Sequence, residues 1–120
     1  MLLKNIDNLE NKLLKEIEAK CTNSFMYRLH YEGILECEKL DSFLDNCNKV
    51  FNFYYSYGKT SNYIKIARGV ISFCEHFLFL LYCHENRKDV YLIKNFKNIN
   101  EDKLLNYYFI MRKLIDEIIF

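Results

Sequence analysis

Apolar residues recur at steps of three and four along the first twenty positions, a spacing that brings them onto one face of an α-helix. Lys12, Glu16 and Lys20 lie four residues apart on the expected exposed side, where they support a helix through weak ion pairs. The pattern predicts an amphipathic helix over residues 3–20, and its apolar stripe consists of Leu2, Ile6, Leu9, Leu13 and Ile17.

The cleanest periodicity lies in the second helical region, from about Phe25 to Tyr57. Six apolar residues there follow spacings of three, four, three, four and three, which is a heptad seam. Gly33 disfavours a helix interior by ~1 kcal/mol, so this region is either one bent helix or two helices. The seam packs against helices of the same chain or pairs with a second copy as a homodimer, and it consists of Cys37, Leu40, Leu44, Cys47, Phe51 and Tyr54.

From Ile64 to His84 the apolar residues are dense enough to leave no polar face. Between Arg68 and His84 only Glu75 is charged, and residues 77–83 are apolar without a break. A helix that is apolar on every side belongs at the centre of a domain. We therefore expect residues 66–81 to form the central helix of the fold.

The remaining segments connect and close this arrangement. Residues 57–62 predict a turn, in which Gly58 ends one helix and Thr60 or Ser61 begins the next. Residues 89–97 fit either a short helix or an extended connection. A last helix is expected from about Glu101, with a stripe formed by Leu104, Tyr108, Met111, Ile115 and Ile118 and widened by Leu105, Phe109 and Ile119.

The composition supports an all-α fold. The 120 residues suffice for one domain, and the chain has three Gly and no Pro, whereas β architectures with tight turns need both residue types. The prediction is one compact bundle over residues 1–120, with four principal helices, one short helix and an apolar central helix.

Charge and cysteine content indicate the compartment and the class of partner. The formal net charge of +1 argues against a general nucleic-acid-binding surface. Five irregularly spaced Cys and no signal-peptide pattern favour reduced thiols in the cytoplasm, or the host cytoplasm for a viral protein. The abundant Asn, Lys, Ile, Tyr and Phe have A/T-rich codons, which suggests a viral or phage genome. No uninterrupted apolar run reaches the ~20 residues of a membrane span.

The residues that could hold a metal ion are poorly spaced for it. Cys74, His76, Cys83 and His84 lie close in sequence, but Cys74 and His76 point to nearly opposite faces of a helix. The sequence has neither a C-x-x-C nor an H-E-x-x-H motif. With no nucleophile–base pair and no phosphate loop either, we expect no metal, no cofactor and no catalytic residue.

Arg68 and His76 invite one comparison with a family. In size and bundle form the chain resembles small nucleases and antitoxins of the HEPN class, whose catalytic signature is an Arg followed four to six residues later by a His. Here the two residues are eight apart. The resemblance therefore implies a HEPN-like bundle without the usual catalytic motif, as one alternative function.

The turn between the second and third helical regions carries the most function-like residues. Tyrosines there surround three cations, two of which share a helical face. Tyr and Arg are frequent at the centres of protein interfaces, so we expect a non-enzymatic module that binds another protein, as an accessory subunit, adaptor or inhibitor. Stacking of bases on the tyrosines is the alternative, which makes nucleic acid the second candidate partner. The candidate binding residues are Tyr54, Tyr55, Tyr57, Lys59, Tyr63, Lys65 and Arg68.

Overall fold

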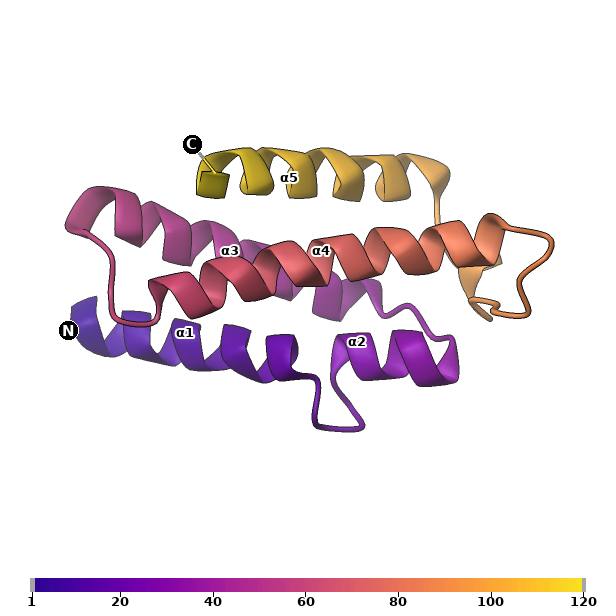
Figure 1. Cartoon of the computed structure of the whole chain (residues 1–120), viewed down its shortest axis with the longest axis horizontal. Helices are drawn as coiled ribbons and strands as arrows, with labels where there is room; N and C mark the ends of the chain where they lie inside the picture. The colour runs from indigo at the N-terminus through magenta and orange to yellow at the C-terminus, as the bar shows by residue number, and fades with distance from the viewer. Residues whose placement is uncertain (1, 120) are drawn as a thin grey trace.

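The computed structural model describes the backbone of residues 2–119 and the side chains of residues 5–119. The described chain contains no strand, and its five α-helices confirm the predicted all-α bundle. Figure 1 shows α1 and α2 following one another along one edge of α4, with α5 along the other edge and α3 behind. The helices are α1 (Leu2–Glu18), α2 (Phe25–Tyr27), α3 (Cys37–Tyr57), α4 (Tyr63–Glu85) and α5 (Glu101–Ile119).

The second helical region is divided at Gly33. After α2 the chain forms a π-helical turn, Arg28–Glu32, and Gly33 ends it with a left-handed φ of 68°. A Cβ atom at this position would lie 2.5 Å from the carbonyl oxygen of Leu92, so both the backbone angle and the space require glycine. Helix α3 begins four residues later, at Cys37, and the region therefore forms two separate helical segments.

The connection from α4 to α5 consists of turns and irregular chain and includes a 3₁₀ turn, Phe96–Asn98. It is fastened to the chain around Gly33, whose carbonyl accepts a hydrogen bond from the Lys94 amide at 2.7 Å. The Asn95 side chain accepts from the Leu35 amide at 2.9 Å and donates to its carbonyl at 2.8 Å. The short helix of the bundle is thus α2 with its π turn, and residues 89–97 form the connection.

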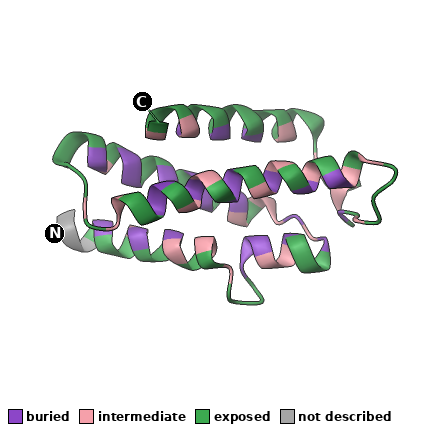
Figure 2. Cartoon of the chain, viewed as in Figure 1, coloured by how far each residue is buried: buried purple, intermediate pink, exposed green. Residues whose placement is uncertain are grey.

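The inner face of α4 forms the centre of the core. Phe73 stacks on Phe43 of α3 with 3.9 Å between ring centroids, and Phe77 meets Tyr107 of α5 edge to face at 6.3 Å. Figure 2 shows the buried positions of α1, α3 and α5 turned toward this helix. Most of the heptad seam of α3 is buried in the same core, so those residues are already covered by helices of their own chain.

The outer face of α4 corrects the expectation that this helix is buried on every side. Phe79 is 60% exposed, Tyr82 64% and Ile64 63%. The neighbouring helices α1, α2, α3 and α5 cover its back and its two edges, and none of them crosses its front (Figure 1). The uninterrupted apolar run at residues 77–83 therefore contributes side chains both to the buried inner face of α4 and to its exposed outer face.

By length and composition alone, α4 could also cross a membrane, although its apolar run is interrupted by Lys65, Arg68, Ser72, Glu75 and His76. The central helix of a globular domain meets the same criterion, because its buried face is as apolar as lipid. In this structure 44% of the most apolar window of α4 is buried inside the bundle.

Candidate functional site

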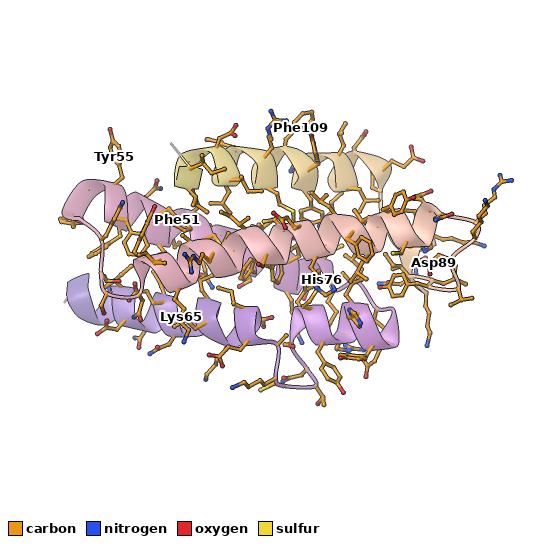
Figure 3. The ribbon with its side chains drawn as sticks, viewed as in Figure 1. Phe51, Tyr55, Lys65, His76, Asp89 and Phe109 are labelled. Atoms are coloured by element: carbon orange, nitrogen blue, oxygen red, sulfur yellow. The ribbon has the colours of Figure 1, made fainter. Side chains whose placement is uncertain are left out.

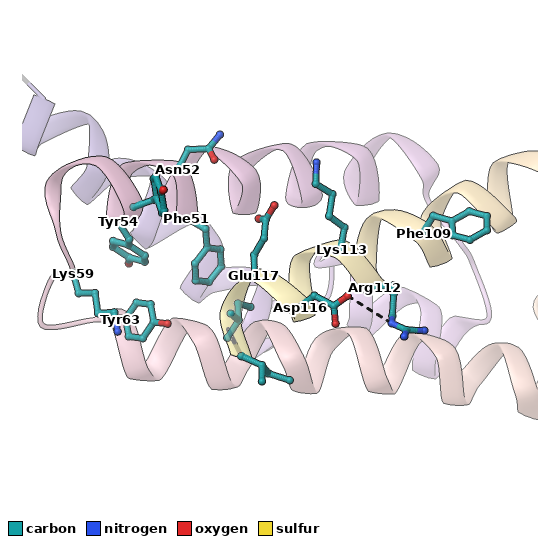
Figure 4. A pocket seen from close by; sticks show the side chains of 13 residues that line it. Phe51, Asn52, Tyr54, Lys59, Tyr63, Phe109, Arg112, Lys113, Asp116 and Glu117 are labelled. Carbon is teal, nitrogen blue, oxygen red and sulfur yellow. Dashed lines mark ion pairs between the residues drawn. The ribbon is translucent and has the colours of Figure 1, made fainter.

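A cleft of about 1010 Å³ opens at one end of the bundle, where the last turns of α3, the first turn of α4 and the last turns of α5 come together (Figure 4). Four of the seven predicted binding residues line it, namely Tyr54, Tyr55, Lys59 and Tyr63. The other three, Tyr57, Lys65 and Arg68, lie outside it. The structure thus brings together, in one cleft, only the predicted residues between Tyr54 and Tyr63, without Tyr57.

Tyr54 forms a fixed wall of this cleft. Its hydroxyl donates to the carboxylate of Glu10, which is 1% exposed and also accepts from the Thr60 hydroxyl and, at 3.4 Å, from the Asn62 side-chain Nδ2. Burial and the Glu10 carboxylate raise the pKa of Tyr54. Three donors satisfy a buried carboxylate that would otherwise be costly, and this network holds the turn between α3 and α4 against α1.

The aromatic side of the cleft centres on Tyr63. Its ring lies edge to face with Tyr54 at 5.3 Å and with Phe51 at 6.2 Å, and the Lys59 ammonium sits 4.2 Å from its centroid. A cation over an aromatic face gains about 0.5–1 kcal/mol at an exposed site. The pair places one positive charge at the rim of an apolar surface.

The two predicted cations outside the cleft point elsewhere. Lys65 turns toward α1, where its ammonium lies 3.8 Å from a Glu18 carboxylate oxygen (Figure 3). Arg68 is exposed on the outer side of α4. Tyr57 packs against Phe53 with 5.0 Å between centroids. The three predicted cations therefore do not converge on one track that a nucleic-acid backbone could follow.

The opposite wall of the cleft comes from α5, which the sequence analysis assigned to the core. Phe109 and Ile119 were expected to widen the buried stripe of that helix, yet they are 56% and 62% exposed, and Leu105 is exposed as well. Arg112 and Asp116 form an ion pair at 3.8 Å beside them. The apolar residues of α5 span a wider part of the helix than the single stripe that the core buries. This excess width was the sequence signal that part of α5 stays exposed.

The residues considered for metal binding or catalysis are dispersed. Cys74 is buried, whereas His76 faces the π turn, where its Nε2 lies 2.9 Å from His30 Nδ1. Burial and the neighbouring His30 lower the pKa of His76. His84 Nδ1 accepts a hydrogen bond from the Ile93 amide at 2.9 Å, and Arg68 lies on the exposed face of α4. Residues 5–119 contain no group of three or more His, Cys, Asp or Glu arranged to hold a metal ion.

Comparison with protein-family models, with curated proteins and with solved structures finds no match for this chain.

Proposed function

We propose that the protein is a non-enzymatic module that binds another protein through the cleft between α3, α4 and α5. The observation that supports the proposal is the apolar lining of the cleft, to which exposed Phe109 and Ile119 contribute from α5 and Tyr55 and Tyr63 from the other two helices. Large exposed aromatic and aliphatic side chains gathered in a concave surface mark binding sites, because leaving them in water is unfavourable.

The size and charge of the cleft favour a segment of a protein as its occupant. Its volume, about 1010 Å³, lies at the upper limit of the roughly 300–1,000 Å³ typical of small-molecule pockets. Both signs of charge occur in its lining, with positive charge on Lys59 and Lys113 and negative charge on Asp116 and Glu117. An amphipathic helix fits these features, with apolar anchors entering the cleft and charged residues of either sign at its rim.

The partner can be identified and the contact tested in two steps. A photo-cross-linking amino acid at Phe109 should capture a partner in the cells that produce the protein, whereas the same group at exposed Tyr31 on the π turn should not. With the purified partner, calorimetry should show that Phe109→Ala weakens binding at least tenfold, because aromatic anchors dominate interfaces. Phe79→Ala on the outer face of α4 is the matched control, since its ring is 60% exposed and Phe109 is 56% exposed.

Nucleic acid is the alternative partner, and variants of residues in the same cleft distinguish the two hypotheses. If labelled oligonucleotides bind at moderate salt, and Lys59→Ala lowers the dependence of affinity on salt, phosphate contacts carry the function and the protein-binding proposal is wrong. Equal partner binding by wild type and Phe109→Ala would also overturn it.

A further inference from the structure

The outer face of α4 carries a continuous row of exposed residues. Ile64, Arg68, Ser72, Glu75 and Phe79 are all exposed and follow one another at spacings of four, four, three and four. That spacing keeps them on one side of a helix, and it is the spacing of the contact seam between two packed helices. The row is therefore arranged like a second helix-packing surface, separate from the one that α4 buries in the core.

Two opposite charges lie at the middle of this row. Arg68 and Glu75 are seven residues apart, roughly 10 Å along the helix, with Ser72 between them. No ion pair within residues 5–119 includes either one. Farther out, Ile64 lies beyond Arg68 and Phe79 beyond Glu75, each by four residues. The pairs Arg68–Glu75 and Ile64–Phe79 share one midpoint, between residues 71 and 72, so opposite charges lie at equivalent positions on either side of it, while exposed Tyr82 extends the row by three further residues at one end.

This symmetry identifies an occupant. We propose that the outer face of α4 binds a second copy of this chain, with the two α4 helices packed antiparallel about a two-fold axis near residues 71 and 72. In that register Arg68 faces Glu75 of the second copy, and Ile64 faces Phe79 of the second copy. A two-fold contact forms each of these pairs twice, because both partners use the same surface.

The charges also select the orientation. In a parallel pair Arg68 would face Arg68 of the second copy, and Glu75 would face its own equivalent, so like charges would repel at both positions. Insertion of the face into lipid would leave the same two charges unpaired in an apolar medium. The antiparallel pair is the arrangement in which both charges are compensated and the small side chain of Ser72 lies at the closest approach.

The neighbouring elements leave room for this contact. On one edge of α4, Gly69 packs against Ile17 of α1 and His76 against His30 of the π turn, and α5 lies along the other edge (Figure 3). The exposed row lies between these two covered edges. A contact of one helix per partner is small, so we expect a dimer whose population depends on protein concentration.

Charge reversal gives a test that an accidental contact would not pass. By sedimentation equilibrium, Arg68→Glu and Glu75→Arg should each weaken self-association at least tenfold, because each variant places like charges face to face twice. An equimolar mixture of the two variants should restore dimers, since one chain then carries two positive charges and the other two negative charges. The double variant, with both residues exchanged in one chain, should also recover the wild-type dimer.

The apolar part of the contact has its own matched pair of variants. Phe79→Ala should weaken the dimer at least tenfold, and Phe109→Ala should leave it unchanged, although the two rings are similarly exposed. Circular dichroism checks that each variant is folded. A wild-type chain that stays monomeric at high protein concentration overturns the proposal. A dimer that tolerates both charge reversals, or a mixture that does not restore it, also overturns the antiparallel contact.

Discussion

The inner and outer faces of α4 are both apolar, yet they have different environments. On the inner face Phe77 is fully buried and meets rings from α2 and α5. Two residues farther along the same helix, Phe79 projects from the outer face with more than half of its surface exposed. The comparison shows that hydrophobicity alone does not determine which face of a helix the chain covers.

What differs between the two faces is the pattern of charge. The buried positions of α4 are apolar without exception, whereas its exposed row includes Arg68 and Glu75. A charge without a partner is costly in a core, so the folded chain keeps both of them at the surface. The aromatic residues beside them are then exposed as well, and they become available for contact with another molecule.

The largest effect is expected from a charge on the inner face. Phe77→Asp should destabilise the fold by more than about 4 kcal/mol, because it places an unpaired carboxylate among buried rings. Leu78→Asp should cost clearly less, since Leu78 is only partly buried at the edge of the core. Urea unfolding followed by circular dichroism measures both. Equal losses for the two variants would contradict the graded burial around α4.

A smaller effect is expected at the edge where α4 meets α1. A Cβ atom at Gly69 would lie 2.6 Å from Ile17 Cγ2, so Gly69→Ala should destabilise the fold by about 1–2 kcal/mol despite the better helix propensity of Ala. Combining Gly69→Ala with Ile17→Ala should remove the clash, and the two effects should therefore not add in a double-mutant cycle. Strictly additive effects would show that the two helices do not touch there. Ser72→Ala, on the outer face of the same helix, is the control and should change stability by less than about 0.5 kcal/mol.

The smallest effect is a pH dependence at the edge where α4 meets the π turn. His76 lies against His30, and Glu75 and Glu18 are the nearby carboxylates. Burial and His30 lower the pKa of folded His76 below the ~6.5 of an unfolded histidine. As pH falls through ~6.5, His76 binds a proton in the unfolded chain but stays neutral in the folded chain. Protonation therefore favours the unfolded state, and stability decreases toward lower pH. His76→Gln should reduce the slope of unfolding free energy against pH between 7.5 and 5.5, and an unchanged slope would contradict this assignment.

The sequence predicted the helices well because their signals are local. Apolar spacing indicated α1, α3, α4 and α5, and Gly58 and Gly33 marked the ends of two helical segments where a positive φ is needed. At Gly33 the sequence did not distinguish one bent helix from two helices. The contact that requires glycine there is made by Leu92, which is far along the chain, so no local pattern shows it.

The candidate site was predicted only in part, because its two walls are distant in sequence. Residues 54–63 are local and carry an unusual density of Tyr, so they could be found. The wall from α5 was missed: the width of its apolar pattern indicates that some apolar residues stay exposed, but it does not indicate that Phe109 is one of them. Tyr54 acquires its structural role through Glu10, forty-four positions away, and this contact is equally invisible in the local pattern.

We propose that the outer face of α4 serves association and not folding. Phe79→Asp tests it most directly when unfolding and sedimentation are measured on the same preparation. We expect cooperative unfolding of the monomer within about 0.5 kcal/mol of wild type, together with loss of the dimer at high concentration. Loss of cooperative unfolding would show that Phe79 belongs to the core, and a persisting dimer would show that the two copies meet elsewhere.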